Sequence, residues 1–256
     1  MKIEKTSKKK PIIAVAQIKY FDISYSNNLA KLKKFIKKAK KRNADIICFP
    51  ESCIHRSKVL KKDDKFIKEL KEECKKNSIW CIITEDLKLK DKSHNTSILI
   101  DRQGEIKGYY KKINLYGDGE KITPGTRINT FKTDFGKIGI VICWDLAFPK
   151  LFQRLKRAGT QIVFCPSLWQ YEPTAHDKNP KKRETKILRS LILSRAFENI
   201  FFVAFCNPVI KSKYQVSYSA IASPHKILNE IINKEGLITA KIDLSKIKKY
   251  EKIYRN

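Results

Sequence analysis

Short apolar segments at regular intervals are the feature that most constrains the fold of this chain. They include "PIIAVAQI", "ADIICFPE", "SIWCIITE", "QIVFCPS" and "IFFVAFCN". Such runs are typical of strands that are covered on both faces. Between them lie lysine-rich segments with a helical period, and "SNNLAKLKKFIKKAKKRN" places Leu29, Leu32, Ile36 and Ala39 on one stripe. Alternating buried strands and amphipathic helices predict an α/β fold in layers, with helices outside the sheets.

Glycine-containing turns add antiparallel pairs to this pattern. "NTSILID" and "EIKGYYKKI" read as one hairpin, and "INTFKTDFGKIGIVIC" reads as a second. Further helices are predicted at about 62–76, in "PKLFQRLKRAGT" with Pro149 in its first turn, and in "RETKILRSLILSRAFEN". The tail returns to hairpins in "YSAIAS", "KILNEI" and "GLITAKIDL". We therefore expect sheets that contain both parallel and antiparallel strands. Because the chain shows no internal repeat and no linker, we expect a single domain over residues 1–256.

The charge of the chain is strongly positive, because 55 Lys and Arg stand against 26 Asp and Glu, giving +29. A nucleic-acid partner must be considered for such a chain. The basic residues are mostly lysines scattered over many segments, and arginine, the better reader of phosphates and bases, is scarce. We therefore do not expect specific nucleic-acid binding. A catalytically idle, basic protein associated with nucleic acid remains the rival interpretation.

Membrane and secretion signals are not evident. No run of eighteen apolar residues is present, which argues against a membrane span, and the basic N-terminus is not followed by a small-residue cleavage site. The seven cysteines form no CxxC pair and no zinc-binding pattern. They are read as free thiols in the reducing cytoplasm.

Three residues stand where chemistry would place them, although each can also be ordinary. Cys143 follows a buried strand in "KIGIVICWDLAFP" and precedes a helix, a position where ligands bind in α/β folds, yet free cysteines are most often core residues. Glu51 ends the apolar run "DIICFPE", where a dry environment can make a carboxylate a base, or it is a solvated strand end. Lys112, in "GYYKKINL", lies on the opposite face from Lys111, so that one of the two can point inward.

The segments "CFPE", "YYKKINL" and "ICWDLAFP", in this order and spacing, resemble the three motif regions of the nitrilase, or carbon–nitrogen hydrolase, superfamily. The resemblance implies a triad in which Glu51 is the general base, Lys112 stabilises the oxyanion and Cys143 is the nucleophile. It also implies that Glu120, in "GEKITPG", positions the lysine and the substrate. No metal or cofactor is called for. The implied fold is a four-layer α-β-β-α sandwich.

The same resemblance implies a small amide or N-carbamoyl amine as substrate, cleaved through a cysteine thioester. Nitrile hydrolysis by the same triad is the alternative, and acyl transfer to an amine would need an acceptor domain that we do not find. Trp144, Phe148 and Trp169 are candidates for lining the pocket, and the loop 168–181 is expected to cover it. Members of the superfamily pair through a helical face, so a homodimer or higher homo-oligomer is expected, and "RETKILRSLILSRAFEN" is apolar enough to contribute.

Departures from the family pattern lie outside the triad. Asn114 stands where many members have His, Lys150 follows the Phe-Pro where an acidic residue is common, and His225-Lys226 replaces a usual Asp-Gly turn. These departures concern substrate preference and leave the chemistry unchanged.

Overall fold

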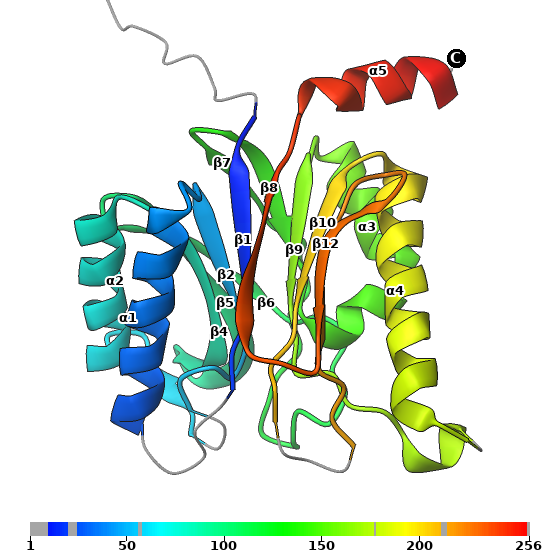
Figure 1. Cartoon of the computed structure of the whole chain (residues 1–256). Helices are drawn as coiled ribbons and strands as arrows, with labels where there is room; N and C mark the ends of the chain where they lie inside the picture. Colours follow the sequence, from blue (N-terminus) through cyan, green and yellow to red (C-terminus); the bar gives the residue numbers. More distant parts are fainter. Residues whose placement is uncertain (1–9, 20–24, 56–57, 177, 211–213, 255–256) are drawn as a thin grey trace, which may run out of the picture.

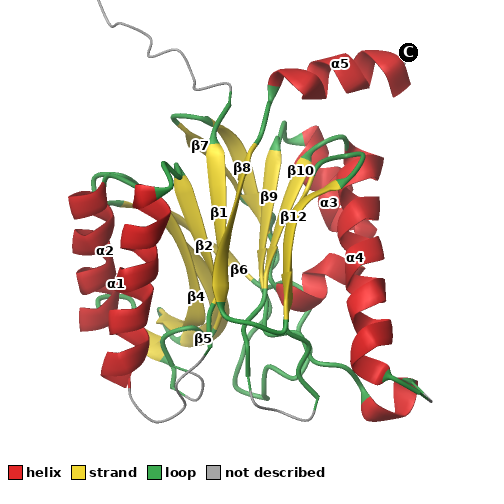
Figure 2. Cartoon of the chain, in the orientation of Figure 1, coloured by secondary structure: helices red, strands yellow, loops and turns green. Residues whose placement is uncertain are grey.

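The computed structural model describes residues 10–19, 25–55, 58–176, 178–210 and 214–254. Within these ranges the chain forms two β-sheets that face each other, with helices on the outer side of each (Figures 1 and 2). This is the four-layer α-β-β-α sandwich that the resemblance implies. The first nine residues, where the N-terminal expectation falls, lie outside the described residues.

The first sheet has seven strands among the described residues and mixes parallel and antiparallel pairs. Its order is β13 (Gly236–Lys241), β1 (Ile12–Gln17), β2 (Ile46–Glu51), β4 (Trp80–Leu89), β5 (Lys92–Ile100) and β6 (Ile106–Lys111), with β3 (Leu60–Lys61) also paired to β4. The helices α1 (Tyr25–Lys41) and α2 (Lys65–Asn77) cover its outer face (Figure 1). The predicted stripe of α1 is confirmed, because Leu29, Leu32, Ile36 and Ala39 are all buried.

The second sheet has six strands in the described part of the chain. Its order is β12 (Ile227–Ile232), β11 (Tyr218–Ala222), β10 (Phe202–Cys206), β9 (Ile162–Pro166), β8 (Gly136–Ile140) and β7 (Thr130–Thr133). The helices α3 (Pro149–Arg157) and α4 (Pro180–Asn199) cover it, and α5 (Ser245–Tyr254) lies beyond the end of the sheets (Figure 1). Two short 3₁₀ helices, η1 (Cys143–Ala147) and η2 (Pro173–Ala175), interrupt the loops.

Contacts between the inner faces join the two sheets. The Cys206 thiol on β10 donates to the carbonyl of Cys48 on β2 at 3.2 Å, and the Ser219 hydroxyl donates to the Gln17 side chain at 2.8 Å. One apolar cluster fills the space between the sheets and extends under α3 and α4, and a second lies between the first sheet and α1 and α2. The ends of strands from both sheets are thereby held against each other.

Three elements differ from the sequence prediction. The predicted strand 78–85 continues to Leu89, because its second half pairs with β5. Of the hairpins predicted in the tail, that of "YSAIAS" and "KILNEI" is confirmed by the antiparallel pair of β11 and β12, but "GLITAKIDL" does not extend it, since β13 crosses to the other sheet and pairs with β1. Helix α5 was not predicted, and Ile247 is its one buried residue.

Candidate active site

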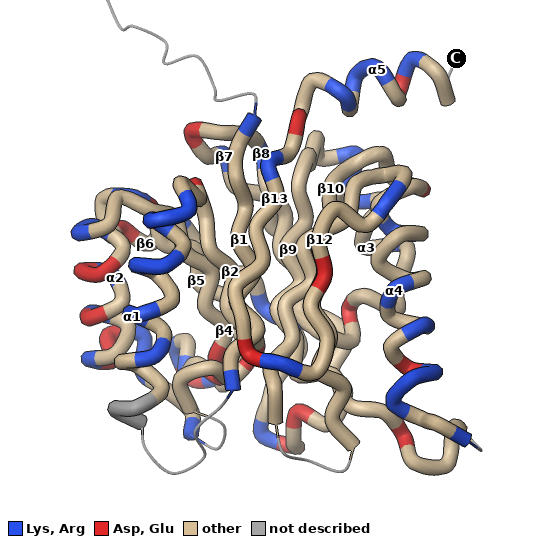
Figure 3. Tube along the Cα trace, in the orientation of Figure 1, with Lys and Arg blue, Asp and Glu red and all other residues tan. Residues whose placement is uncertain are grey.

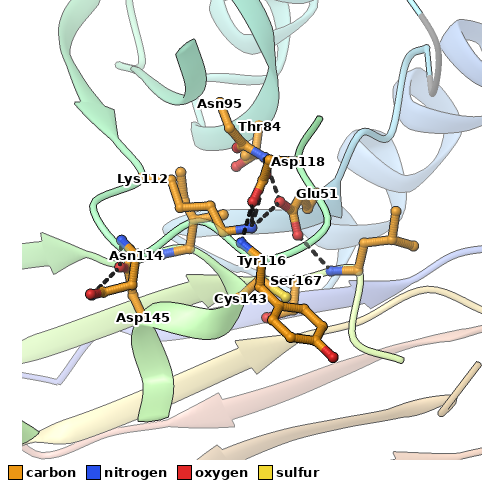
Figure 4. Close-up of polar contacts among 12 residues, drawn as sticks. Glu51, Thr84, Asn95, Lys112, Asn114, Tyr116, Asp118, Cys143, Asp145 and Ser167 are labelled. Atoms are coloured by element: carbon orange, nitrogen blue, oxygen red, sulfur yellow. Dashed lines mark hydrogen bonds and ion pairs between the residues drawn. The ribbon is translucent and has the colours of Figure 1, made fainter. Parts of the chain in front are cut away.

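The three candidate residues come from the ends of strands in both sheets. Glu51 is the last residue of β2 and Lys112 directly follows β6, so both belong to the first sheet. Cys143 follows β8 of the second sheet and begins η1. All three are buried, with exposed fractions of 4% for Glu51, 2% for Lys112 and 8% for Cys143. Because the two sheets face each other, residues from distant parts of the chain meet in one cavity (Figure 4).

A compact network of charges surrounds Lys112. Its Nζ lies 3.1 Å from Glu51 Oε1 and 3.0 and 2.9 Å from the two carboxylate oxygens of Asp118. The Asn95 side chain donates to Glu51 Oε1 at 2.5 Å and to Asp118 Oδ1 at 2.8 Å. These contacts fix the ammonium and both carboxylates in one arrangement (Figure 4).

The second oxygen of Glu51 faces the cysteine side of the cavity. The backbone N–H of Leu168 donates to Glu51 Oε2 at 2.8 Å and also stabilises the charged form of Cys143. Glu51 and Lys112 both act on Cys143 through their charges. A carboxylate that can take the thiol proton and an ammonium that can hold negative charge therefore lie beside the sulfur.

Burial controls the protonation of these groups. It raises the pKa of the Cys143 thiol well above its usual value, and the charge of Glu51 raises it further, more than Lys112 lowers it. The resting sulfur is therefore a neutral thiol that must lose its proton as it reacts. Burial alone lowers the pKa of Lys112, but the negative charges of the Glu51 and Asp118 carboxylates outweigh this effect and raise it, so the lysine remains an ammonium.

The backbone at Cys143 is strained. Its φ of 46° lies in the left-handed region, which a residue with a Cβ rarely adopts. Such strain persists only where the surrounding structure enforces it, and it clusters at functional sites. Arg195 of α4 contributes to this restraint, because its guanidinium donates to the carbonyls of Leu146 and Ala147 at the end of η1.

Asp145 ties the turn of Cys143 to the segment after Lys112. Its carboxylate accepts hydrogen bonds from the backbone N–H of Ile142 at 3.0 Å and from the Tyr110 hydroxyl at 2.7 Å. It also accepts from the backbone and side-chain nitrogens of Asn114. Asn114 therefore has a structural partner in Asp145.

The cavity has a volume of about 410 Å³. Polar and charged side chains make up part of its lining, and five lining residues are aromatic: Tyr116, Trp144, Trp169, Tyr171 and Tyr214. The ring centroids of Trp144 lie 4.8 Å from Tyr116 and 5.4 Å from Trp169. Residues 168–173, the first part of the loop 168–181 that was expected to cover the pocket, line the cavity.

Two predicted positions lie elsewhere. Glu120 is exposed and does not line the cavity, and the carboxylate against Lys112 belongs to Asp118, two residues earlier in the same loop. The expectation that Glu120 positions the lysine is therefore replaced by Asp118. Phe148 is 38% exposed, packs edge-on against Trp144 and does not line the cavity, whereas Trp144 and Trp169 do.

Four polar residues of the site were missed by the sequence analysis: Asp86, Asn95, Asp118 and Asp145. Asp145 lies inside the motif "ICWDLAFP", and its acidic character beside the cysteine was an available signal. In the described part of the chain, no three His, Cys, Asp or Glu side chains are grouped so that they could hold a metal ion.

Comparisons with known proteins identify the family of the chain. The model of the family described as carbon–nitrogen hydrolase matches residues 12–252. The 2-oxoglutaramate amidase of Bacillus subtilis is 28% identical over 242 residues, which cover 88% of each chain. The omega-amidase NIT2 of Xenopus tropicalis is 25% identical and covers 86% of this chain and 84% of its own.

Among solved structures, Nit3 of Saccharomyces cerevisiae, a member of branch 10 of the nitrilase superfamily, superimposes with a TM-score of 0.82. It is 24% identical, and the match covers 96% of this chain and 94% of the other. This likeness confirms the fold.

Proposed function

The chain belongs to the carbon–nitrogen hydrolase family, and from this premise we propose that it cleaves small amides with Glu51, Lys112 and Cys143 as its catalytic triad. The observation that carries the proposal is the convergence of a carboxylate, an ammonium and a thiol from three distant segments in one buried cavity. Cleavage of carbon–nitrogen bonds other than peptide bonds is the activity that the family and the amidase relatives support.

The first half of the reaction forms a thioester. Glu51 takes the proton of the Cys143 thiol while the sulfur attacks the carbonyl carbon of the amide. The negative oxygen that develops accepts hydrogen bonds from the Lys112 ammonium and from the backbone N–H of Trp144, which has no acceptor within the short helix η1. Glu51 then gives its proton to the nitrogen, and ammonia or an amine leaves.

The second half restores the enzyme. Glu51 removes a proton from a water molecule as the water oxygen attacks the thioester carbon. The tetrahedral intermediate collapses to the free acid, and the departing sulfur recovers a proton from Glu51. One carboxylate therefore serves both halves, while Lys112 keeps its charge throughout. No histidine is needed.

The finer assignments are also proposals. An amide or N-carbamoyl amine is preferred over a nitrile because the relatives named above are amidases. A cytoplasmic location is supported by the seven cysteines, all of which are free and buried. No helix of the described residues is long and apolar enough to cross a membrane.

We expect the chain to act as a single domain and to form a homo-oligomer through α4 and α5. Ile187 and Phe197 of α4 and Ile253 and Tyr254 of α5 are each more than 40% exposed. The Phe197 and Tyr254 rings lie 5.6 Å apart, which makes the exposed apolar surface continuous from one helix to the other. Apolar surface of this kind is commonly covered in an assembly.

An ammonia-release screen tests the proposed activity. Small amides, carbamoyl amines, ω-amides of dicarboxylic acids and nitriles are offered to the wild-type protein, to Cys143→Ala and to Cys74→Ala as a control. Cys74 is buried on α2 and does not line the cavity. Wild type and Cys74→Ala are expected to release ammonia, and Cys143→Ala at least about 10³-fold less. Release by a folded Cys143→Ala variant at the wild-type rate would end the proposal.

A further inference from the structure

The cavity is acidic although the chain as a whole is strongly basic. Among the described residues that line it, four carry carboxylates, namely Glu51, Asp86, Asp118 and Glu172, and Lys112 alone carries a positive charge. Lys112 already contacts Glu51 and Asp118. The lining therefore has an excess of negative charge, even though the chain carries +29.

Two acceptor atoms of residues that line the cavity are buried without a hydrogen-bond partner among the described residues. They are Asp86 Oδ1 and Asn95 Oδ1. Asn95 is 4% exposed, and its Nδ2 donates to two carboxylates, which fixes its oxygen in the opposite direction. A buried polar atom without a partner is costly, and in a binding site it indicates a missing group of the complementary kind.

The side chains of Asp86 and Asn95 share one face of the first sheet. Asp86 of β4 and Asn95 of β5 are direct cross-strand partners, so their side chains point to the same face of the sheet. Both line the cavity. Since both free atoms are acceptors and one belongs to a carboxylate, the complementary group is a donor that carries positive charge.

The protonation state of Asp86 also favours a cationic ligand. Burial, and then the charges of Glu51 and Asp118, raise the pKa of Asp86 to about 6, despite the opposing effect of Lys112. Asp86 is therefore largely ionised at neutral pH but lacks a counter-ion of its own. A ligand cation would supply it.

The aromatic walls suit the same kind of ligand. The faces of tryptophan and tyrosine rings attract ammonium and guanidinium groups. Trp144 and Tyr116 stack beside the catalytic centre, and the Tyr116 hydroxyl donates to Glu172 at the border of the cavity. A substrate with a second carboxylate would instead meet several negative charges there.

We propose that the substrate is an amide bearing a positive charge, an amine or guanidine at the far end of a short aliphatic chain, and that Asp86 and Asn95 receive this cation. The inference rests on the proposed amidase function, because it assigns the substrate class of the same site. In this proposal, Asp86 is the residue that makes the enzyme prefer a cationic substrate over a neutral or anionic one.

The test compares three amides of nearly equal shape: 5-aminopentanamide, which is cationic, hexanamide, which is neutral, and adipamate, which is anionic. We expect kcat/KM for the cationic amide to exceed that for hexanamide at least about tenfold, with adipamate lowest. Hydrolysis of hexanamide or adipamate as efficient as that of the cationic amide would overturn the inference and leave the amidase function standing.

Variants assign the preference to Asp86. Asp86→Asn is expected to reduce the ratio of the cationic to the neutral kcat/KM about tenfold or more. Asp91→Asn is the matched control, because it makes the same change of charge at an exposed position of the same hairpin and does not line the cavity. An unchanged ratio in Asp86→Asn, or an equal fall in both variants, would contradict the role of Asp86.

Binding to the Cys143→Ala variant separates this inference from the proposed function. Calorimetry is expected to show tighter binding of 5-aminopentanamide than of hexanamide or adipamate. If the wild-type protein hydrolyses none of the three but this order of affinity holds, the amidase proposal fails and the cation site stands. Equal or reversed affinities would remove the cation site whatever the turnover.

Discussion

At the scale of single residues, Asp145 decides whether the site holds together. It accepts hydrogen bonds from Tyr110, Asn114 and Ile142, which belong to the two segments that carry Lys112 and Cys143. Replacing it by alanine removes both acceptor oxygens and leaves the donors of these three residues without a partner, and each such group is costly where it is buried. The turn that carries Cys143 would then no longer be held in a fixed position relative to Lys112.

We therefore expect Asp145→Ala to lower the free energy of unfolding by about 3 kcal/mol and to reduce kcat by more than the loss of folded protein explains. Urea unfolding and ammonia release at a temperature where the variant is folded measure the two effects. Asp91→Ala is the control and should change stability by less than about 0.5 kcal/mol. A variant with wild-type stability would show that Asp145 does not tie the segments together.

The triad residues could be predicted from the sequence, but other residues of the site could not. Glu51, Lys112 and Cys143 stand in short motifs at strand ends, and the structure brings them to one cavity. Glu120 was predicted from the family resemblance of "GEKITPG", whereas Asp118 contacts Lys112. Asp118 lies in an irregular loop where no periodicity indicates which side chain points inward. Asp86 was missed because the predicted strand ended one residue before it, whereas β4 continues to Leu89.

At the scale of elements, β4 supports the turn that follows β2. The carboxylate of Glu85 is fully buried and accepts the backbone N–H groups of Ile54 at 2.6 Å and His55 at 3.2 Å. Burial raises the pKa of Glu85 to about 8, more than these hydrogen bonds lower it. A proton is therefore held in the folded protein at a pH where the unfolded chain has released it.

This difference predicts a stability that depends on pH. The usual pKa of Glu85 is 4.5 and the folded value is about 8, so between these values the folded state binds more protons than the unfolded state. The contribution of Glu85 is complete below pH 4.5 and is lost as the pH rises toward 8, with a slope of up to about 1.4 kcal/mol per pH unit.

Urea unfolding of the wild-type protein and of Glu85→Gln between pH 5 and 9 measures this effect. The difference in unfolding free energy between the two should shift in favour of the variant as the pH rises. Asp86 makes a similar pH-dependent contribution to both proteins. Taking the difference between their unfolding free energies at each pH therefore removes it. Glu72→Gln, on the exposed side of α2, should show no such shift. Parallel pH profiles for wild type and Glu85→Gln would contradict the assignment.

The order of helices and strands was largely predictable, because the residues that form the periodic apolar patterns in the sequence are the residues that are buried in the structure. The stripe of α1 and the run "IICFPE" of β2 are buried as their patterns indicate. Helix α5 was not predicted, since its lysine-rich segment buries Ile247 alone and so has little apolar period. The crossing of β13 to the other sheet depends on contacts with β1, more than two hundred residues away in sequence, which no local pattern encodes.

At the scale of the whole molecule, charge and exposed apolar surface have different distributions. Lysine and arginine occur on α1, α2, α4 and α5 (Figure 3), which agrees with the view that the charge does not form one binding face. The absence of specific nucleic-acid binding remains a prediction. Of the eight large apolar side chains that are exposed among the described residues, four lie on α4 and α5, namely Ile187, Phe197, Ile253 and Tyr254.

The oligomer is therefore expected to depend on α4. Sedimentation velocity should show the wild-type protein as a dimer or larger, and Phe197→Glu should shift it toward the monomer, because burying a charge in an apolar interface is unfavourable. Val59→Glu is the control, since Val59 is exposed and lies outside both helices. A monomeric wild-type protein, or an equal effect of both variants, would contradict the proposed interface.

The most direct test of the central claim is to find the acyl group on the nucleophile. The wild-type protein is mixed with its best amide from the screen, quenched in acid during turnover and digested with trypsin. Cleavage after Lys137 and Lys150 yields a peptide, residues 138–150, in which Cys143 is the one cysteine. Mass spectrometry is expected to show this peptide heavier by the mass of the acyl group, and hydroxylamine should remove the added mass. Turnover with the acyl group on another cysteine, or persisting in the Cys143→Ala variant, would contradict the account.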